Sequence, residues 1–222
     1  MNVLKKFFGV LLLLTCMILP QVVSAEKTDW SDPNYNFRRV RTVVVLDLTE
    51  SAGMYDVSNA VRMKMEGDYL KHSNKLKCEV LTEDQARRIL GLSPNASHQQ
   101  LCNRLSEIAD LWIESDINTW ENSSYVVPAR TVWEDRKRTR RVRDRWGYWR
   151  EETYYESVPV TYPPYRVDTS IIVTNFGVHD TRNGKLVFIR EDNRSRDDRD
   201  AQKDMFGRMA NSFFEDFAKK IR

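Results

Sequence analysis

Three aspartates carry the acid–base chemistry that this sequence offers. Asp47 ends one short apolar run, Asp110 begins a later one, and Asp116 lies within that later run. Two carboxyl groups at neighbouring strand ends can act as general acid and general base. A hydrolase of wall or surface glycans is therefore one hypothesis. Turn-facing or helix-capping aspartates explain the same positions without catalysis, and this is the commoner explanation.

The motifs of several common enzyme classes are absent from the sequence. It holds no glycine-rich phosphate loop, no serine-nucleophile elbow and no His-Glu-x-x-His zinc helix. His72, His98 and His179 are far apart along the chain, and each is interpreted as a surface or capping residue. Scattered histidines and two isolated cysteines make no zinc pattern. We therefore predict a protein that is not an enzyme and has no metal or cofactor.

Residues 125–165 have the most unusual composition in the chain. They hold nine basic and six acidic residues, three of the six tryptophans and six of the nine tyrosines. Seven basic residues and one aspartate give Arg136–Arg145 a local net charge of +6. Glu151, Glu152 and Glu156 follow, so the segment is basic first and acidic second.

Two interpretations of this segment compete. In the functional one, an extended hairpin binds an anionic polymer or a partner, because guanidinium groups fork onto phosphate or carboxylate and stack on rings. The candidate binding residues are Trp133, Arg136, Arg138, Arg140, Arg141, Arg143, Trp146, Tyr148 and Trp149. In the other, arginines and glutamates pair across a twisted β-ribbon that aromatic side chains cover. Folding the segment back places basic residues opposite acidic ones, which favours the second interpretation for most of them.

Cys78 and Cys102 offer a disulfide bond in an oxidising compartment. Closing a loop of this size would stabilise the fold by about 3 kcal/mol. The alternative is two small buried apolar residues, one on a strand and one on a helix. The sequence leaves both open.

Short apolar runs predict the strands. VRTVVVLDL at residues 40–48 suits a strand buried on both faces, while residues 76–81 and 110–120 alternate. Asn183-Gly184 lies between apolar runs at 167–178 and 185–190 and predicts a hairpin. The run Glu191–Asp200 mixes charges of both signs without apolar residues, and we expect a solvated loop there.

Capping residues and helical spacing predict the helices. Asp56 can cap a helix, and capping boxes begin at Thr82 and at Ser97. The chain ends on a helix from about Asp200 with a core-facing stripe formed by Phe206, Ala210, Phe213, Phe217 and Ile221.

The element order is therefore β-α-β-α-α-β, an insertion, then β-β-α. It predicts the α/β (α+β) class, with a mixed β-sheet and helices packed on it. Residues 26–39 are expected to form a polar leader, and residues 40–222 a single domain that carries a ribbon insertion at about 121–166.

The first 25 residues have the three parts of a secretory signal. Lys5 and Lys6 precede an apolar stretch at residues 7–20, and cleavage is predicted after Ala25. The stretch is shorter than the roughly 20 residues that cross a bilayer. Leu13-Leu14-Thr15-Cys16 loosely resembles a bacterial lipobox, and we expect membrane attachment only if Cys16 is lipidated.

Removing the signal changes the charge balance. The whole chain has a net charge of +3, and loss of two lysines leaves 33 basic and 32 acidic residues. The exported protein therefore lacks the global positive field of a nucleic-acid binder. Export argues against a nucleic-acid partner as well.

Several short phrases resemble small bacterial envelope proteins. They are Thr42–Leu48, Ala109–Ile113 and the hairpin Val178–Val187. The corresponding fold is similar to the amino-terminal domain of TolB, the curli secretion lipoprotein, and the lipoproteins that activate penicillin-binding proteins. Pro33–Val43 also looks like the opening of an uncharacterised family of exported bacterial proteins. The resemblance covers most of residues 33–120 and 167–221. It implies binding and assembly roles.

The sequence thus predicts a non-enzymatic protein of the periplasm or cell envelope of a bacterium, binding a protein partner or an anionic envelope polymer. One alternative is a structural component that self-assembles into a homo-oligomer through the ribbon at 125–165. The other is the glycan hydrolase described above.

Overall fold

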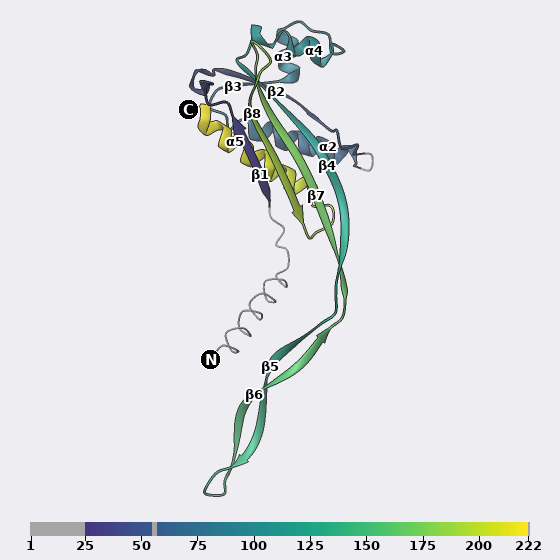
Figure 1. Ribbon diagram of the computed structural model, residues 1–222, viewed down its shortest axis with the longest axis vertical. Coiled ribbons are helices and arrows are strands. Elements are labelled where there is room, and N and C mark those ends of the chain that lie inside the picture. The colour runs from purple at the N-terminus through teal and green to yellow at the C-terminus, as the bar shows by residue number, and fades with distance from the viewer. Residues whose placement is uncertain (1–24, 55–56, 222) are drawn as a thin grey trace, which may run out of the picture. The chain divides into compact units, whose positions relative to one another are not determined.

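The computed structural model describes residues 25–54 and 57–221. Residues 1–24 of the predicted signal, with Cys16, and the Asp56 cap lie outside them. Two compact units make up the described chain (Figure 1). The first comprises the described residues up to Ser123 and from Thr169 onward, and the second is Ser124–Asp168.

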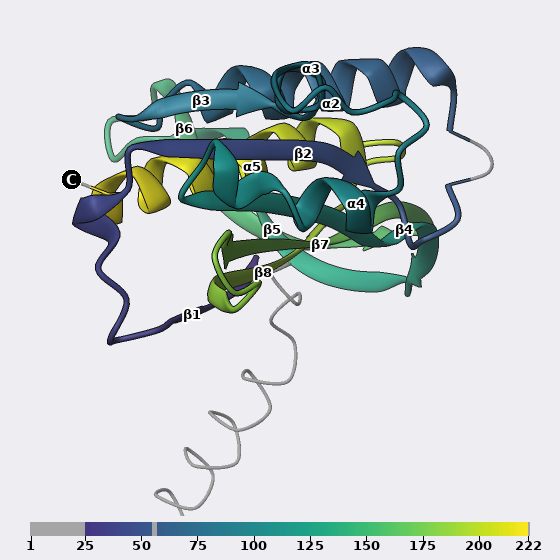
Figure 2. The same ribbon diagram turned by 90° about the horizontal axis from the view of Figure 1, so that it is seen from above.

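A six-stranded mixed sheet forms the centre of the first unit. Its order is β1-β8-β7-β4-β2-β3, and Figure 2 shows the strands from β3 at the top to β1 at the bottom. β2 is parallel to β3 and β4, whereas β8 is antiparallel to β1 and β7. The strands are β1 Glu26–Ser31, β2 Thr42–Thr49, β3 Glu79–Thr82, β4 Leu111–Val127, β7 Tyr165–Asp180 and β8 Leu186–Arg196.

Helices pack on both faces of this sheet, which confirms the predicted fold class. α2 (Asn59–Ser73) and α5 (Gln202–Ile221) share one core cluster with Val43 and Val45. α3 (Glu83–Ile89) and α4 (His98–Cys102) share the other with Val44 and Leu46. Successive residues of β2 thus point into opposite cores, as the continuous apolar run predicted. Short 3₁₀ turns lie at Phe37–Arg39 and Leu105–Glu107.

The two predicted capping boxes and the predicted stripe of the last helix are present in the structure, whereas the N-cap of α2 is Ser58. Thr82 and Ser97 each form a reciprocal capping box, with Gln85 and Gln100 respectively. The predicted stripe of α5 is buried along its full length. Phe213 lies at the centre of this aromatic core, stacked on Phe176 at 4.5 Å between ring centroids.

The polar leader expected at residues 26–39 is wrong in its first half, because Glu26–Ser31 form β1, a strand of the sheet. β1 pairs with β8 from Glu26↔Asn193 to Ser31↔Phe188. Arg190, only 1% exposed, forms a two-pronged ion pair with Asp29 at 2.5 and 2.6 Å. Lys27 reaches Asp216 of α5 at 2.6 Å. The charged residues of β1 therefore fasten an edge strand, a position where charge is common.

The predicted Asn-Gly hairpin joins β7 to β8, with Gly184 at a φ of 68° that favours glycine. The solvated loop expected at 191–200 is wrong in its first part, because β8 continues to Arg196. Asp192 is buried there and accepts two hydrogen bonds from Arg194 at 2.7 and 2.8 Å. Paired charges replace the apolar residues that mark most buried strands.

The disulfide considered for Cys78 and Cys102 is not formed. Both are free thiols. Cys78 packs against the core cluster that holds α2 and α5, and Cys102 packs against the cluster that holds α3 and α4. The sheet therefore lies between them, and a bond would require it to open. The structure therefore supports the second alternative: Cys78 and Cys102 are small, unbonded residues that are half-buried.

The second unit is a two-stranded antiparallel ribbon. β5 (Arg130–Arg143) pairs with β6 (Trp149–Tyr162) in unbroken register from Arg130↔Tyr162 to Arg143↔Trp149. The unit spans Ser124–Asp168, where the sequence predicted an insertion at about 121–166.

Candidate functional site

The register of the ribbon divides its side chains between two faces. Residues directly opposite each other in an antiparallel pair share a face, and successive residues alternate. One set, here called the charge-paired face, contains Arg136, Arg138, Arg140 and their partners Glu156, Tyr154 and Glu152. The other, here called the aromatic face, contains Trp133, Lys137, Arg141, Arg143 and their partners Pro159, Tyr155, Glu151 and Trp149.

Arginines of the charge-paired face bind glutamates of the same ribbon. Arg138 Nε lies 3.1 Å from Glu156 Oε2, and Arg140 donates twice to Glu152 Oε2 at 2.9 and 3.0 Å. The guanidinium of Arg140 also lies 5.2 Å from the ring centre of Tyr154. For Arg138 and Arg140, the cross-strand pairing predicted from sequence is confirmed.

Three large rings of the aromatic face are bare. Trp133 and Tyr155 are each 71% exposed and Trp149 is 67% exposed. On the charge-paired face, by contrast, Tyr154 and Tyr162 are 38% and 40% exposed beside arginines. Burying a large ring stabilises a protein, so rings left in water on one face alone indicate a contact surface.

The cations of the aromatic face are less engaged than those of the other face. Within the described chain, Lys137 and Arg141 form no ion pair. Arg143 donates from Nε to the carbonyl oxygen of Gly147 at 2.9 Å. Its guanidinium carbon lies 5.6 Å from the ring centre of Trp149. Two carboxylates share this face, Asp135, which accepts from Ser157, and Glu151.

The turn at the ribbon tip carries the remaining candidates. Asp144 Oδ1 accepts hydrogen bonds from the backbone N–H groups of Trp146 and Tyr148 at 2.9 and 3.0 Å. Gly147 takes a φ of 86°, and the guanidinium of Arg145 lies 4.1 Å from the ring centre of Trp146. Trp146 and Tyr148 are exposed.

The structure separates the binding residues predicted from sequence. Trp133, Arg141, Arg143 and Trp149 share the aromatic face; Trp146 and Tyr148 lie at the tip; Arg136, Arg138 and Arg140 lie on the charge-paired face. Sequence reasoning missed Lys137 and Tyr155. Counting every second residue from Trp133 would have found Lys137, and the hairpin register then adds Tyr155.

The aspartates proposed for acid–base chemistry do not form the expected pair. Asp110 accepts hydrogen bonds from the backbone of Arg41 and Thr42, at the start of β2. Asp47 lies five residues beyond Thr42 along this strand, about 16 Å away at the rise of a β-strand. Glycosidase carboxyl groups are about 5 to 10 Å apart. Asp116 accepts from Thr49 Oγ1 and the backbone N–H of Ser51. Two of the three aspartates therefore cap backbone groups.

Asp47 should make the free energy of unfolding depend on pH. Partial burial, and then the charge of Glu83, raise its pKa to about 6. The folded state therefore binds a proton more tightly than the unfolded state, and stability falls as pH rises from about 4 to 6. Discounted for the exposure of the side chain, the loss is about 1 kcal/mol.

Asp47→Asn should recover this energy and raise the thermal midpoint by about 2 to 4 °C at pH 8. Most of the gain should vanish at pH 4, where Asp47 of the folded wild type is already protonated and carries no charge. Calorimetry of both proteins at the two pH values measures the difference. An equal gain at pH 4 and pH 8 would show that the charge of Asp47 is not its cause.

His179 is half-buried, not the surface or capping histidine expected. Its Nε2 lies 2.8 Å from Glu114 Oε1, and its ring stacks on Trp112 at 4.9 Å. Burial lowers the pKa of His179, but the hydrogen bond with Glu114 outweighs it, so the pKa is raised overall. A Cβ at Gly177 would meet this pair at 3.1 to 3.2 Å. These contacts tie β7 to β4.

Other features of the described chain provide no site. Burial raises the pKa of both thiols to about 11, so Cys102 is a protonated neighbour of His98 at 3.3 Å. No group of three or more histidine, cysteine or acidic side chains within the described ranges is placed to hold a metal ion. No helix there has the length and apolar character needed to cross a membrane.

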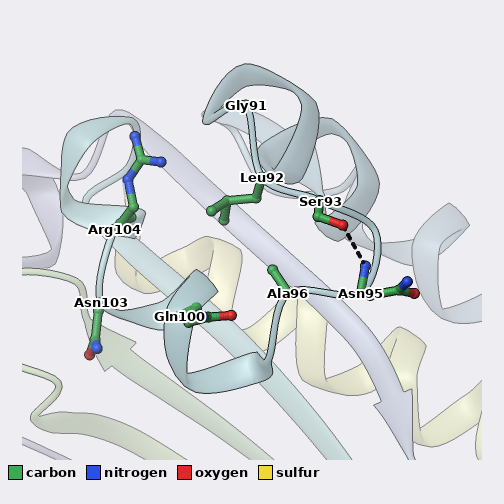
Figure 3. Close-up of a pocket in the computed structure, with 8 residues that line it drawn as sticks. All are labelled: Gly91, Leu92, Ser93, Asn95, Ala96, Gln100, Asn103 and Arg104. Carbon is green, nitrogen blue, oxygen red and sulfur yellow. Dashed lines mark hydrogen bonds between the residues drawn. The ribbon is translucent and has the colours of Figure 1, made fainter.

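A shallow hollow of about 600 Å³ lies between the end of α3 and the start of α4 (Figure 3). Uncharged groups such as Ser93, Asn95 and Gln100 line most of it. Its one charged lining residue, Arg104, is bound to Glu107 at 2.8 and 2.9 Å. The hollow therefore offers no free charge to fix a ligand.

Neither a protein-family model nor a curated protein matches the chain. Solved structures of bacterial proteins do match. The PelC dodecamer from Paraburkholderia phytofirmans has a TM-score of 0.47 at 11% identity, covering 88% of this chain and 98% of its own. Lipoprotein GNA1162 from Neisseria meningitidis has a TM-score of 0.43 at 10% identity, covering 81% and 99%. A DUF4136 family protein from Bacteroides thetaiotaomicron has a TM-score of 0.37 at 9% identity, covering 89% and 97%.

Proposed function

We propose that this chain is a non-enzymatic, exported protein of the bacterial cell envelope that binds a partner through the aromatic face of its ribbon. The observation that carries the proposal is the contrast between the two faces. On the charge-paired face, arginines form ion pairs with glutamates of the same ribbon. On the aromatic face, the rings of Trp133, Tyr155 and Trp149 are exposed to solvent beside Lys137 and Arg141. The signal pattern in the first 25 residues supports the export part of the proposal.

Physical chemistry favours contact at this face. A large aromatic side chain buries about 150 to 250 Å² when covered, and each Å² of apolar area contributes about 25 cal/mol. Tryptophan, tyrosine and arginine are also the residues enriched where binding energy concentrates. The threonines between the rings, such as Thr139 and Thr153, add hydroxyl groups that can bond to a partner.

Site-specific photo-crosslinking tests the proposal. Tyr154 and Tyr155 are adjacent in sequence but point to opposite faces, so they form a matched pair. Each is replaced by a photoreactive phenylalanine analogue in cells, the envelope is irradiated, and adducts of the protein are resolved by mass. We expect a reproducible adduct from position 155 and little from position 154. Equal adducts from both positions, or none from either, would refute a binding role for the aromatic face.

A second function is favoured by the open edges of the ribbon. β5 and β6 form a sheet of only two strands among the described residues, so one edge of each is unpaired. Two-stranded ribbons are marginally stable in water, and an unpaired edge can pair with another chain. The exported protein would then be a structural homo-oligomer. Light scattering separates this function from the first, because a monomeric mass at micromolar concentration would remove it.

A further inference from the structure

We infer that the aromatic face binds a linear, carboxylate-bearing polysaccharide, that is, a polyuronate-type chain. This inference rests on the proposed function and names the chemical class of its partner. Three properties of the face support it: the spacing of its rings, the kind of charge beside them, and the neutral groups between them.

The rings form a row. Lys137, which is opposite Tyr155, lies four residues from Trp133, or about 13 Å at the rise of a strand. Arg143, which is opposite Trp149, lies six residues further, or about 20 Å. A protein partner usually needs a compact patch of about 800 Å² around a buried apolar centre. Widely spaced rings along one line fit an extended polymer better.

The charges beside the rings select among polymers. A pyranose ring offers an apolar face to tryptophan or tyrosine, and its carboxylate offers two oxygens to a guanidinium fork. Arg141, Arg143 and Lys137 supply the cations. A neutral glycan would leave these cations unused, and polyphosphate would leave the rings unused. A polyuronate uses both.

The groups between the rings argue against DNA. Asp135 and Glu151 lie on the same face, where they can accept hydrogen bonds from the free hydroxyl groups of a sugar chain, which a DNA backbone does not offer. Their charge repels phosphate and carboxylate alike, so these hydroxyl contacts are what separates the two polymers. Thr131, Thr139 and Thr153 add hydroxyl groups along the row. A face of mixed rings, cations and hydrogen-bonding groups is suited to a sugar polymer that is charged and rich in hydroxyl groups.

Affinity electrophoresis of the full exported chain provides the test. Alginate is the probe, and dextran, polyphosphate and single-stranded DNA are run at matched length. We expect alginate to retard the wild type and the other three polymers to do so at least tenfold less. Stronger retardation by DNA or polyphosphate, or equal retardation by dextran, would overturn the inference.

Two triple variants with the same loss of charge sharpen the result. Lys137→Gln, Arg141→Gln, Arg143→Gln removes the cations of the aromatic face and should weaken alginate binding at least tenfold. The second variant, Arg136→Gln, Arg138→Gln, Arg140→Gln, removes three cations from the charge-paired face. It should change alginate binding less than threefold. Equal losses would mean that net charge alone draws the polymer. Thermal unfolding of each variant confirms that it is folded.

The two proposals fail in different ways. If alginate does not bind while adducts still form at position 155 and not at 154, the partner class is wrong and the binding face stands. If adducts show no preference for a face, the proposed function itself is wrong.

Discussion

Replacing Phe213 with alanine should lower the free energy of unfolding by about 3 to 5 kcal/mol. Its ring is fully buried and stacks on Phe176 and Phe217, with Phe214 edge-on at 5.0 Å. Removing it leaves a cavity that four aromatic neighbours, including Phe188, cannot refill without shifting the sheet. Against a typical stability of about 5 to 15 kcal/mol, this is a large fraction. Urea denaturation followed by circular dichroism measures it.

An exposed residue on a helix of the same core provides the control. Met63 of α2 is 72% exposed, and Met63→Ala should change stability by less than about 0.5 kcal/mol. If Phe213→Ala changes the free energy of unfolding as little as Met63→Ala does, the aromatic stripe of α5 is not the centre of this core.

Exchanging residues 124–168 for Asn-Gly should abolish partner binding and leave the sheet folded. Neither core cluster contains a residue of this unit. Ser123 and Thr169 lie on neighbouring strands, because Ser170 Oγ donates to Asn122 Oδ1 at 3.1 Å and β4 is next to β7. A two-residue Asn-Gly turn suits such a pair. We expect a pull-down from envelope extracts to recover no partner with this variant, and its thermal midpoint to lie within a few degrees of that of the wild type.

A smaller exchange shows which part of the ribbon binds. Replacing only Asp144–Tyr148 by Asn-Gly keeps Arg143 opposite Trp149 and removes the tip residues Trp146 and Tyr148. Adducts at position 155 should persist in this variant. Their disappearance would assign binding to the tip, and aggregation of the 124–168 exchange would show that the sheet needs the ribbon.

Much of the fold could be predicted because its signals are local. The β-branched run at Thr42–Thr49, the capping box at Thr82 and the Asn183-Gly184 turn each depend on a few adjacent residues. The stripe of α5 repeats at helical spacing and is buried as expected. Patterns that bury apolar side chains can thus be recognised from the order and spacing of neighbouring residues.

β1 and the second half of β8 could not be recognised in this way. Ion pairs hold them in place: exposed Asp29 of β1 meets buried Arg190, and buried Asp192 meets Arg194. Each pair replaces apolar burial with an ion pair, so no hydrophobic alternation marks the strand. Asp29 and Arg190 are 161 residues apart, so no local window holds both. Asp192 and Arg194 are two residues apart, but the burial of Asp192 arises only in the folded sheet.

The candidate site was predicted as a segment and not as a surface. Composition pointed to residues 125–165, yet it could not say which arginines were already bound to glutamates. That depends on register, since a shift of one residue moves every side chain to the other face. With the register known, Arg138 and Arg140 separate from Arg141 and Arg143.

The pairing of β1 with β8 sets the order in which the sheet can be completed during synthesis. Asp29 and Arg190 are 161 residues apart in sequence. β1, the first strand in the chain, therefore cannot pair until β8, the last strand, is available. Contacts of such long range slow folding because the loop must close before the contact forms. Until then, the outer edge of β8 is a free template for other nascent chains. A chaperone that shields β1 or β8 in this interval would raise the yield of folded protein more than it raises its final stability.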